Sequence, residues 1–286
     1  MNRKALLRIT AYGLVLICFT MLFTVVNYPT EQLSAYVNSW IVSASEGAVT
    51  AGESRIRLPK ALVVSDITLR EGVPEPVNLG EAVIRPGILA LLTGKKAADV
   101  RLLNPWLRLR SRAVSTADSL EIDVRDAEVD LAELPQDLLP VPLEISGKVR
   151  LSLYLLTDAP SPETFSGNVR ISSDPIVITG NLLETLGLSP FNITSILAVA
   201  TVKDNVASLG ENGIEGDLTA AANGEIRLMP ADLTASRLNL NVDLAPGPDK
   251  KEKMGPIFTL MGARVKGDGS VNIRVRGTVK RPVVTM

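Results

Sequence analysis

The chain has 286 residues, with 30 lysines and arginines against 31 aspartates and glutamates, no histidine and one cysteine, Cys18. This balance of charge gives no sign of a nucleic-acid partner or a strongly acidic partner. The lack of histidine excludes Ser-His-Asp and Cys-His catalysis and histidine-based zinc sites. With Cys18 as its single thiol, the chain can form neither an internal disulfide nor a cysteine metal site.

A long apolar run near the start predicts a membrane anchor. Arg3, Lys4 and Arg8 precede an almost uninterrupted apolar stretch from Ile9 to Val26. At a helical rise of ~1.5 Å per residue, this stretch is about long enough to cross a hydrocarbon core of ~30 Å. The basic residues on its N-terminal side predict that the N-terminus stays in the cytoplasm.

The same stretch favours a retained anchor over a cleaved signal peptide. A cleavable signal has an apolar region of ~7–15 residues and an A-x-A-like cleavage site. Here the run is longer and closes at Asn27-Tyr28-Pro29 without such a site. Tyr28 suits the headgroup level of a membrane, where amphipathic rings are enriched. We therefore expect a cytoplasmic tail, 1–8, and a single transmembrane signal anchor, 9–28, with the rest of the chain outside the cytoplasm.

The segment 29–45 is predicted to form an amphipathic helix. Thr30, directly after Pro29, is a suitable N-cap. One apolar stripe follows at the spacing of a helix face: Leu33, Tyr36, Val37, Trp40 and Ile41. The stripe predicts packing on the following domain. Its aromatic residues leave open a position on the membrane surface, although the polar side has no basic residues.

Alternation of apolar and polar residues predicts a mainly β domain over 46–286. The clearest runs are Val149, Leu151, Leu153 and Leu155; Leu238, Leu240, Val242 and Leu244; and Val271, Ile273, Val275 and Val279. A period of two places apolar side chains on one face and polar ones on the other, which is typical of a long antiparallel sheet with one wet face. Short helices are expected at 86–93 and 181–188.

The apolar face of such a sheet must be covered by a core, a partner or a ligand. If the sheet curves into a half-pipe, its aliphatic side chains form a dry groove, where a lipid acyl chain would gain ~0.8 kcal/mol per buried CH₂. If the sheet stacks on itself as a sandwich, the same face is simply core. The residues alone leave both interpretations open.

The last strand pattern, Ser270–Val284, is a candidate interaction edge. A terminal strand can offer unpaired backbone groups to a neighbouring sheet. The residues proposed for this edge are Val271, Ile273, Val275 and Val279. Pro282 suits an edge strand, or it merely ends the strand and protects the edge from aggregation.

Acidic residues are the remaining material for catalysis or metal binding. The candidate catalytic pairs are Asp123 with Asp126 and Asp217 with Glu225. Acid pairs on strands and loops are usually solvated, and the acidic run 123–133 lacks the glycine that a calcium loop requires. We expect no enzymatic activity, no cofactor and no metal site.

Two segments resemble known families. The segment 91–109, LLTGKKAADVRLLNPWLRL, is similar to the AsmA-like pattern of a short helix, Gly-Lys, a strand, proline and an alternating strand. The segment 275–284, VRGTVKRPVV, resembles the closing strand of that group. With one N-terminal anchor and this length, the chain resembles the type II secretion system protein N (GspN) family. The resemblance implies a single-pass inner-membrane protein with a β-rich periplasmic domain.

This resemblance also implies a function. We expect a non-enzymatic scaffold or adaptor of the type II protein secretion machinery, in contact with other envelope proteins of that system. The AsmA-like features imply the alternative, a curved sheet whose apolar groove binds or transfers lipid acyl chains. Neither function involves nucleic acid.

Overall fold

In the computed structural model this chain is mainly β, and the structure describes residues 30–45, 47–57, 61–70, 76–87, 90, 94–138, 142–158, 163–260 and 262–285. The predicted tail, 1–8, and anchor, 9–28, lie outside these ranges. Within the ranges, no helix is long and apolar enough to cross a membrane. The chain divides after Arg85 into two compact units.

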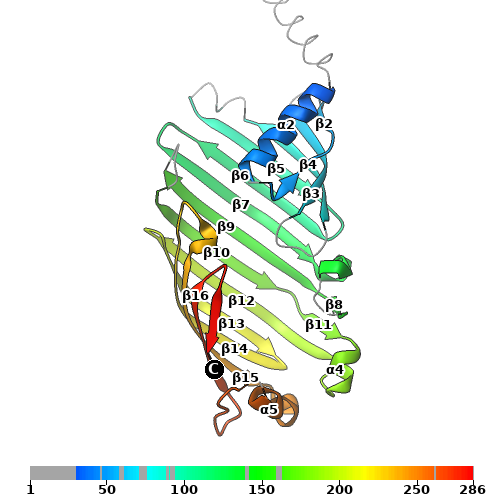
Figure 1. Cartoon of the computed structure of the whole chain (residues 1–286), viewed down its shortest axis with the longest axis vertical. Helices are drawn as coiled ribbons and strands as arrows, with labels where there is room; N and C mark the ends of the chain where they lie inside the picture. The colour runs from blue at the N-terminus through cyan, green and yellow to red at the C-terminus, as the bar shows by residue number, and fades with distance from the viewer. Residues whose placement is uncertain are drawn as a thin grey trace, which may run out of the picture. The chain divides into compact units, whose positions relative to one another are not determined.

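The first unit is a small antiparallel sheet with one helix against it (Figure 1). The helix, α2 (Thr30–Ala44), occupies the segment that was predicted to be helical. The strands are β1 (Val49–Thr50), β2 (Ser54–Arg57), β3 (Ala61–Leu69) and β4 (Val77–Pro86). β3 pairs with β1 and β2 along one side and with β4 along the other.

The apolar stripe predicted for α2 divides between two faces of the helix. Val37 is buried, and Leu33 and Ile41, four residues to either side, are half-buried. Tyr36 and Trp40 instead point away from the sheet, with 73% and 65% of their surfaces exposed. A helix has 3.6 residues per turn, so a stripe of this width extends beyond the line of contact with a small sheet.

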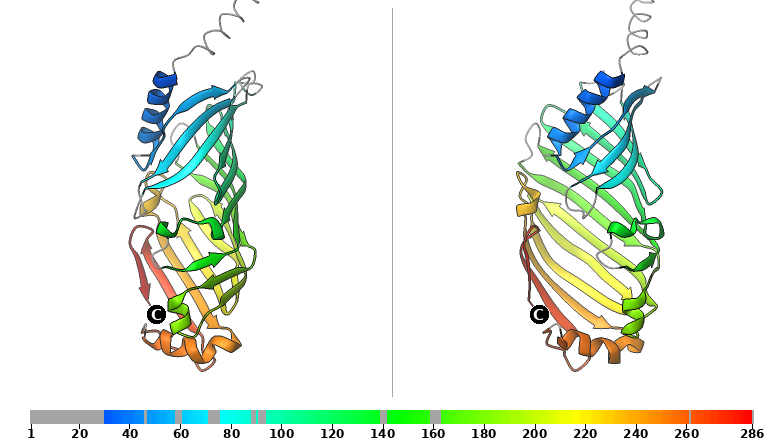
Figure 2. Two further views of the ribbon diagram at one scale, coloured as in Figure 1. Left: turned by 90° about the vertical axis from the view of Figure 1, so that its right-hand side faces the viewer. Right: turned by 45° about the vertical axis from the view of Figure 1, so that its right-hand side comes forward.

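The second unit is one long, strongly twisted antiparallel sheet (Figures 1 and 2). In order of pairing, its main strands are β5 (Lys96–Leu103), β6 (Leu107–Ser115), β7 (Ser119–Asp130), β9 (Lys148–Asp158), β10 (Phe165–Ser173), β12 (Phe191–Lys203), β13 (Val206–Gly216), β14 (Leu218–Arg227), β15 (Arg237–Pro246), β16 (Val271–Thr278) and β17 (Pro282–Thr285). Two short strands, β8 (Glu144–Ser146) and β11 (Ile176–Thr179), pair with each other, and β11 also pairs with the start of β12. The prediction of a long antiparallel sheet is confirmed.

Short helices interrupt the sheet between strands. They are α4 (Asn181–Thr185), α5 (Lys251–Leu260) and the 3₁₀ turns η1 (Leu131–Glu133), η2 (Gln136–Leu138), η3 (Leu233–Ala235) and η4 (Pro248–Lys250). α4 lies in the predicted segment 181–188. In the segment 86–93, Pro86 ends β4 and Ala90 is helical, while 88–89 and 91–93 lie outside the described residues. α5 was not predicted, because Gly255 and Pro256 inside it both disfavour a helix.

The pairing register shows that the two faces of the long sheet differ in chemistry. One row of directly paired residues crosses every main strand and contains only apolar residues and glycines: Ala98, Ala113, Ile122, Leu155, Gly167, Val202, Ala207, Ile226, Leu238, Gly277 and Pro282. The next row is mostly polar: Asp99, Arg112, Asp123, Tyr154, Asn168, Thr201, Ser208, Glu225, Asn239, Arg276 and Val283. Successive side chains point to opposite faces, so the sheet has one apolar face and one polar face.

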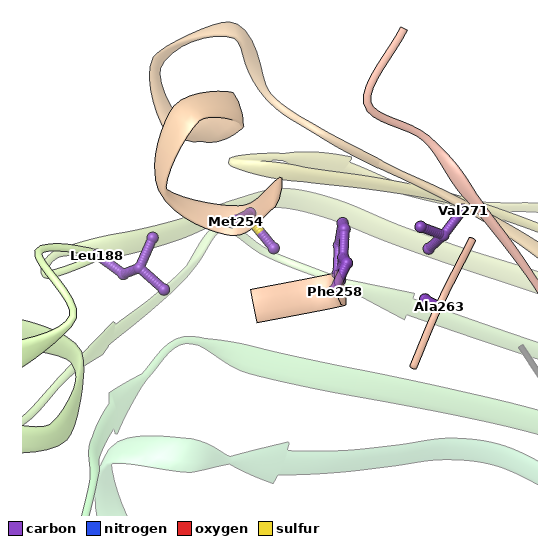
Figure 3. Packing of buried hydrophobic residues seen from close by; sticks show 5 residues of the cluster. All are labelled: Leu188, Met254, Phe258, Ala263 and Val271. Atoms are coloured by element: carbon purple, nitrogen blue, oxygen red, sulfur yellow. The ribbon is translucent and has the colours of Figure 1, made fainter. Parts of the chain in front are cut away.

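At one end of the second unit, the apolar face is a filled core. α5 runs across the ends of the strands (Figure 2). Its Met254 and Phe258 pack with Leu188, Ala263 and Val271 (Figure 3). Partly buried residues of β12, β14, β15 and β16 surround this cluster: Phe191, Leu218, Leu244 and Ile273. The core interpretation of the apolar face therefore holds at this end.

A group of ion pairs connects β7, β9 and the turn after β10. Glu128 accepts hydrogen bonds from Lys148 Nζ at 3.2 Å and from Arg150 Nε at 3.3 Å. The Arg150 guanidinium also donates to both carboxylate oxygens of Asp174, at 2.8 and 2.7 Å. The hydrogen bond from Lys148 is the main cause that lowers the pKa of Glu128, and the hydrogen bond from Arg150 is the main cause that lowers the pKa of Asp174.

These lowered pKa values predict loss of stability in acid. Each carboxylate is more acidic folded than unfolded, so its contribution is present above the unfolded pKa of about 4 and is lost as the pH falls through the folded value. We expect the free energy of unfolding to decrease below about pH 4, measured by urea titration at a series of pH values. Glu128→Gln should give a shallower decrease. An unchanged pH profile in this variant would contradict the assignment.

Candidate apolar groove

A cavity of about 380 Å³ lies on the apolar face of the second unit, away from α5, and is partly open to solvent. We call it the apolar groove. Its walls come from five strands, β9, β10, β12, β13 and β14, and from the segment that follows β14. The side chains in these walls include Leu153, Leu155, Val169, Ala200, Leu209 and Ile226.

The groove has a buried floor. Phe165, Val202 and Ala207 are at most 7% exposed and form a cluster, with Leu155 and Ile226 packed against it. Phe165 begins β10, Val202 lies near the end of β12, and Ala207 lies near the start of β13. The floor is therefore assembled from three neighbouring strands where their connections meet.

Small side chains on β12 leave the volume of the groove unfilled. Ala198 and Ala200 face the groove between the bulkier Ile171 and Val169 of β10, with which they are directly paired. On the other side, Ala200 is paired with Leu209 of β13. An alanine where the neighbouring strands carry branched residues leaves volume that no side chain fills. A register shift between Ala198 and Ala200 bends the strand at the same place.

The polar side chain in the lining of the groove, Asn212, already forms hydrogen bonds with the backbone. Asn212 Oδ1 accepts a hydrogen bond from Val199 N at 2.9 Å, and its Nδ2 donates to Gly210 O at 2.9 Å. The side-chain amide thus binds the backbone at the register shift of β12 and β13. The groove offers dispersion contacts and exclusion of water to a ligand, rather than polar recognition.

A hydroxyl near the floor is buried without a partner. Thr157 of β9 is 4% exposed and is paired with Leu120 and with Phe165. Among the residues that the structure describes, its Oγ1 is one of the buried side-chain oxygens with no hydrogen-bond partner. A buried hydroxyl without a partner is destabilising, because it loses its hydrogen bonds to water.

Thr157→Val is therefore expected to stabilise the chain. The change keeps the shape of the side chain and removes the unpaired hydroxyl, for a gain of about 1 kcal/mol in the free energy of unfolding. Thermal unfolding should shift upward by roughly 2–4 °C. Thr201→Val, on the polar face, is the matched control and should change stability by less than about 0.5 kcal/mol. A loss of stability in Thr157→Val would show that the hydroxyl has a partner in the folded protein.

The acidic pairs predicted as catalytic candidates lie outside the apolar groove. The lining of the groove contains none of Asp123, Asp126, Asp217 and Glu225. Asp123 accepts a hydrogen bond from Arg125 Nε at 2.6 Å. Asp217 directly precedes β14 and Glu225 lies eight positions further along it, about 26 Å at the rise of a strand. Within the described ranges, no group of acidic residues is arranged to hold a metal ion.

The predicted anchor residues Arg3, Lys4, Arg8 and Tyr28 lie outside the described residues.

The predicted edge strand, Ser270–Val284, is instead a hairpin of β16 and β17, so the edge of the sheet is the second strand of that hairpin. Val271, Ile273 and Val275 lie on β16, whose backbone pairs with β15 on one side and β17 on the other. Val279 follows β16, and its N–H donates to Ser236 O at 2.9 Å.

The outer strand of this hairpin is β17. In the described part of the chain, β17 pairs with β16 alone. Its Val283 and Val284 are 57% and 51% exposed. The turn between β16 and β17 is closed by Thr278, whose Oγ1 accepts a hydrogen bond from Arg281 N at 3.1 Å. This turn contains no Asn-Gly or Gly-Pro signal. The alternation pattern therefore predicted one continuous strand where the structure has two.

Leu153 and Leu155 of the lining belong to an apolar run that was identified from the sequence, but the floor residues and the alanines of β12 were not singled out. A signal for the alanines was present in the sequence, since Ala198 and Ala200 are two small residues at alternate positions beside the bulkier Leu197 and Val199. No protein-family model, curated protein or solved structure matches this chain. A function is therefore inferred from the groove and from the edge of the sheet.

Proposed function

We propose that this chain is a non-enzymatic, membrane-anchored protein of the cell envelope whose apolar groove holds the acyl chain of a lipid. The observation that supports this proposal most directly is the groove itself. It has a volume of about 380 Å³, walls of aliphatic side chains and a floor of buried Phe165, Val202 and Ala207. Sites for small molecules have volumes of roughly 300–1,000 Å³ and mostly apolar walls.

The apolar chemistry of the lining suits a flexible hydrocarbon chain better than a compact polar ligand. The engaged amide of Asn212 leaves aliphatic surface as the main contact, and the apolar row continues from the groove to strands on both sides. Burial of about eight CH₂ groups would contribute ~6 kcal/mol, before the entropy lost on association is subtracted. A lipid that remains partly in contact with a membrane can be held usefully by an interaction of this size.

The proposal is tested by site-specific photo-crosslinking in cells. A photoreactive phenylalanine derivative replaces Leu209, which lines the groove, in one full-length variant. In the matched control it replaces Ser208, the preceding residue, which is exposed on the polar face. After irradiation, the purified chains are examined by mass spectrometry for added lipid.

We expect lipid adducts at position 209 and few or none at position 208. Equal labelling at both positions would contradict the proposal, because it would indicate general exposure to membrane lipid. Crosslinking of position 209 to a protein, or the absence of any adduct, would also overturn it.

A second candidate function is the scaffold or adaptor role in type II protein secretion. The resemblance to the type II secretion system protein N family favours it. The structural observation in its favour is β17, an outer strand with two exposed valines. An outer strand of this kind can pair with a strand of a neighbouring envelope protein.

The two functions predict different consequences when the chain is deleted. If the chain serves secretion, folded exoproteins should disappear from the medium and accumulate in the periplasm, while envelope lipids stay normal. If the chain handles lipid, secretion should continue and the lipid composition or detergent resistance of the envelope should change. A quantitative secretome and lipidome of deleted and complemented cells separates these results.

A further inference from the structure

The helix α2 is held against its sheet in one fixed rotation. Ser34 Oγ accepts a hydrogen bond from Ser54 N at 2.8 Å, and Asn38 Oδ1 accepts one from Ala51 N at 2.8 Å. These residues are four positions apart, on the same side as the buried Val37. The contacts determine which face of the helix is turned outward.

The outward face carries two aromatic residues and almost no charge. Tyr36 and Trp40 are 73% and 65% exposed and lie one helical turn apart. Between Glu31 and Ser43, the other exposed residues of α2 are Glu31, Gln32, Ala35, Ser39 and Ser43. Glu31 is the one charged residue in the helix. Large exposed aromatic side chains on such a face indicate contact with an amphipathic environment.

The position of α2 in the sequence indicates what that environment is. The apolar run that predicts the membrane anchor ends at Val26, and α2 begins at Thr30. Pro29, directly before the helix, favours a change of direction there. Tyrosine and tryptophan are enriched at the level of lipid headgroups, where the ring is buried and its polar atom stays wet.

We propose that α2 lies along the membrane surface, with Tyr36 and Trp40 inserted at the level of the lipid headgroups. Trp40 is ten residues from the start of the helix, about 15 Å along its axis. The headgroup layer is only about 5–8 Å thick on each side of the hydrocarbon core. A helix that stood upright on the membrane would carry Trp40 beyond this layer, so contact requires a helix that lies nearly flat.

This orientation would fix the first unit relative to the membrane, because the hydrogen bonds of Ser34 and Asn38 tie the helix to the strands. It rests on the membrane anchor of the proposed function and does not depend on the occupant of the apolar groove. The outward face has no lysine or arginine, so the contact should not require anionic lipid.

The test is quenching of Trp40 fluorescence in the full-length chain, reconstituted in phosphatidylcholine nanodiscs. Trp106→Phe removes the other tryptophan, so that Trp40 is the sole emitter. Separate discs contain lipid brominated near the headgroup end of the acyl chain, lipid brominated near the chain terminus, or no bromine. Iodide in solution measures exposure to water.

We expect loss of Trp40 emission with bromine near the headgroup end, a smaller loss with bromine near the terminus, and the same result in discs with added anionic lipid. Emission that iodide quenches and neither brominated lipid affects would overturn the proposal. Protection from all three quenchers would overturn it as well, because a protein surface would then cover Trp40. Quenching only in anionic discs would contradict the uncharged mode of contact.

Discussion

The substitution Ala200→Phe is expected to weaken lipid binding in the groove roughly 50-fold while leaving the sheet folded. Ala200 lines the groove between Val169 and Leu209, so a phenyl ring at this position would occupy the space that an acyl chain needs. Displacement of about three CH₂ groups would cost ~2.4 kcal/mol, roughly a 50-fold loss of affinity. The measurement is titration of the full-length chain with a fluorescent fatty acid.

The matched control for this substitution is Thr201→Phe. Thr201 is the next residue of β12, and its exposed side chain lies on the polar face. The two variants therefore place the same aromatic ring on the same strand, on opposite faces. Thr201→Phe should bind the fatty acid with nearly unchanged affinity. Equal affinity in the two variants would show that the ligand does not occupy the groove.

The substitution Gly224→Ala is expected to destabilise the second unit by about 3 kcal/mol or more. Gly224 lies in β14 opposite Leu240 and has a φ of +129°, a conformation that residues with a side chain rarely adopt. A Cβ at this position would be 2.2 Å from Asn239 O and 3.0 Å from Leu240 Cα, both backbone atoms of the paired strand. The neighbouring strand would have to shift, which would disturb the ladder that joins β14 to β15.

Thermal unfolding of the full-length chain measures this effect, with a decrease in Tm of roughly 6–12 °C for a domain of this size. Gly210→Ala is the matched control in the neighbouring strand β13. A Cβ at position 210 would lie 3.7 Å from its nearest neighbour, Val199 O, which is an ordinary contact distance. Gly210→Ala should change stability by less than about 1 kcal/mol. Similar losses in the two variants would argue against local strain at Gly224.

Prediction from the sequence succeeded where the signal is local. The alternation of Val149, Leu151 and Leu153 identifies strand β9 without knowledge of its partners, because successive side chains of a strand point to opposite faces. The same reasoning failed for α5, where Pro256 hides a helix that tertiary packing of Met254 and Phe258 supports. It also failed for the last hairpin, because the turn after Thr278 contains none of the usual turn residues.

The groove could not be located from the sequence, because it depends on the register between strands. Ala200 meets Val169 and Leu209 only through pairings that connect β10, β12 and β13. A shift of one residue in any pairing would turn the alanine to the polar face. The same limit applies to α2, where the spacing of Tyr36, Val37 and Trp40 shows a stripe but not which part of it contacts the sheet.

The sequence by itself determined that this chain has no histidine chemistry, that an apolar run precedes Tyr28, and that most of the chain after Gly47 alternates as antiparallel strands. These properties depend on composition and on neighbours within a few residues. The tertiary structure decided that the apolar face is a packed core beneath α5 and an open groove beside Ala200. That difference arises from which side chains meet across strands far apart in the sequence, and from whether their combined volume fills the space between them.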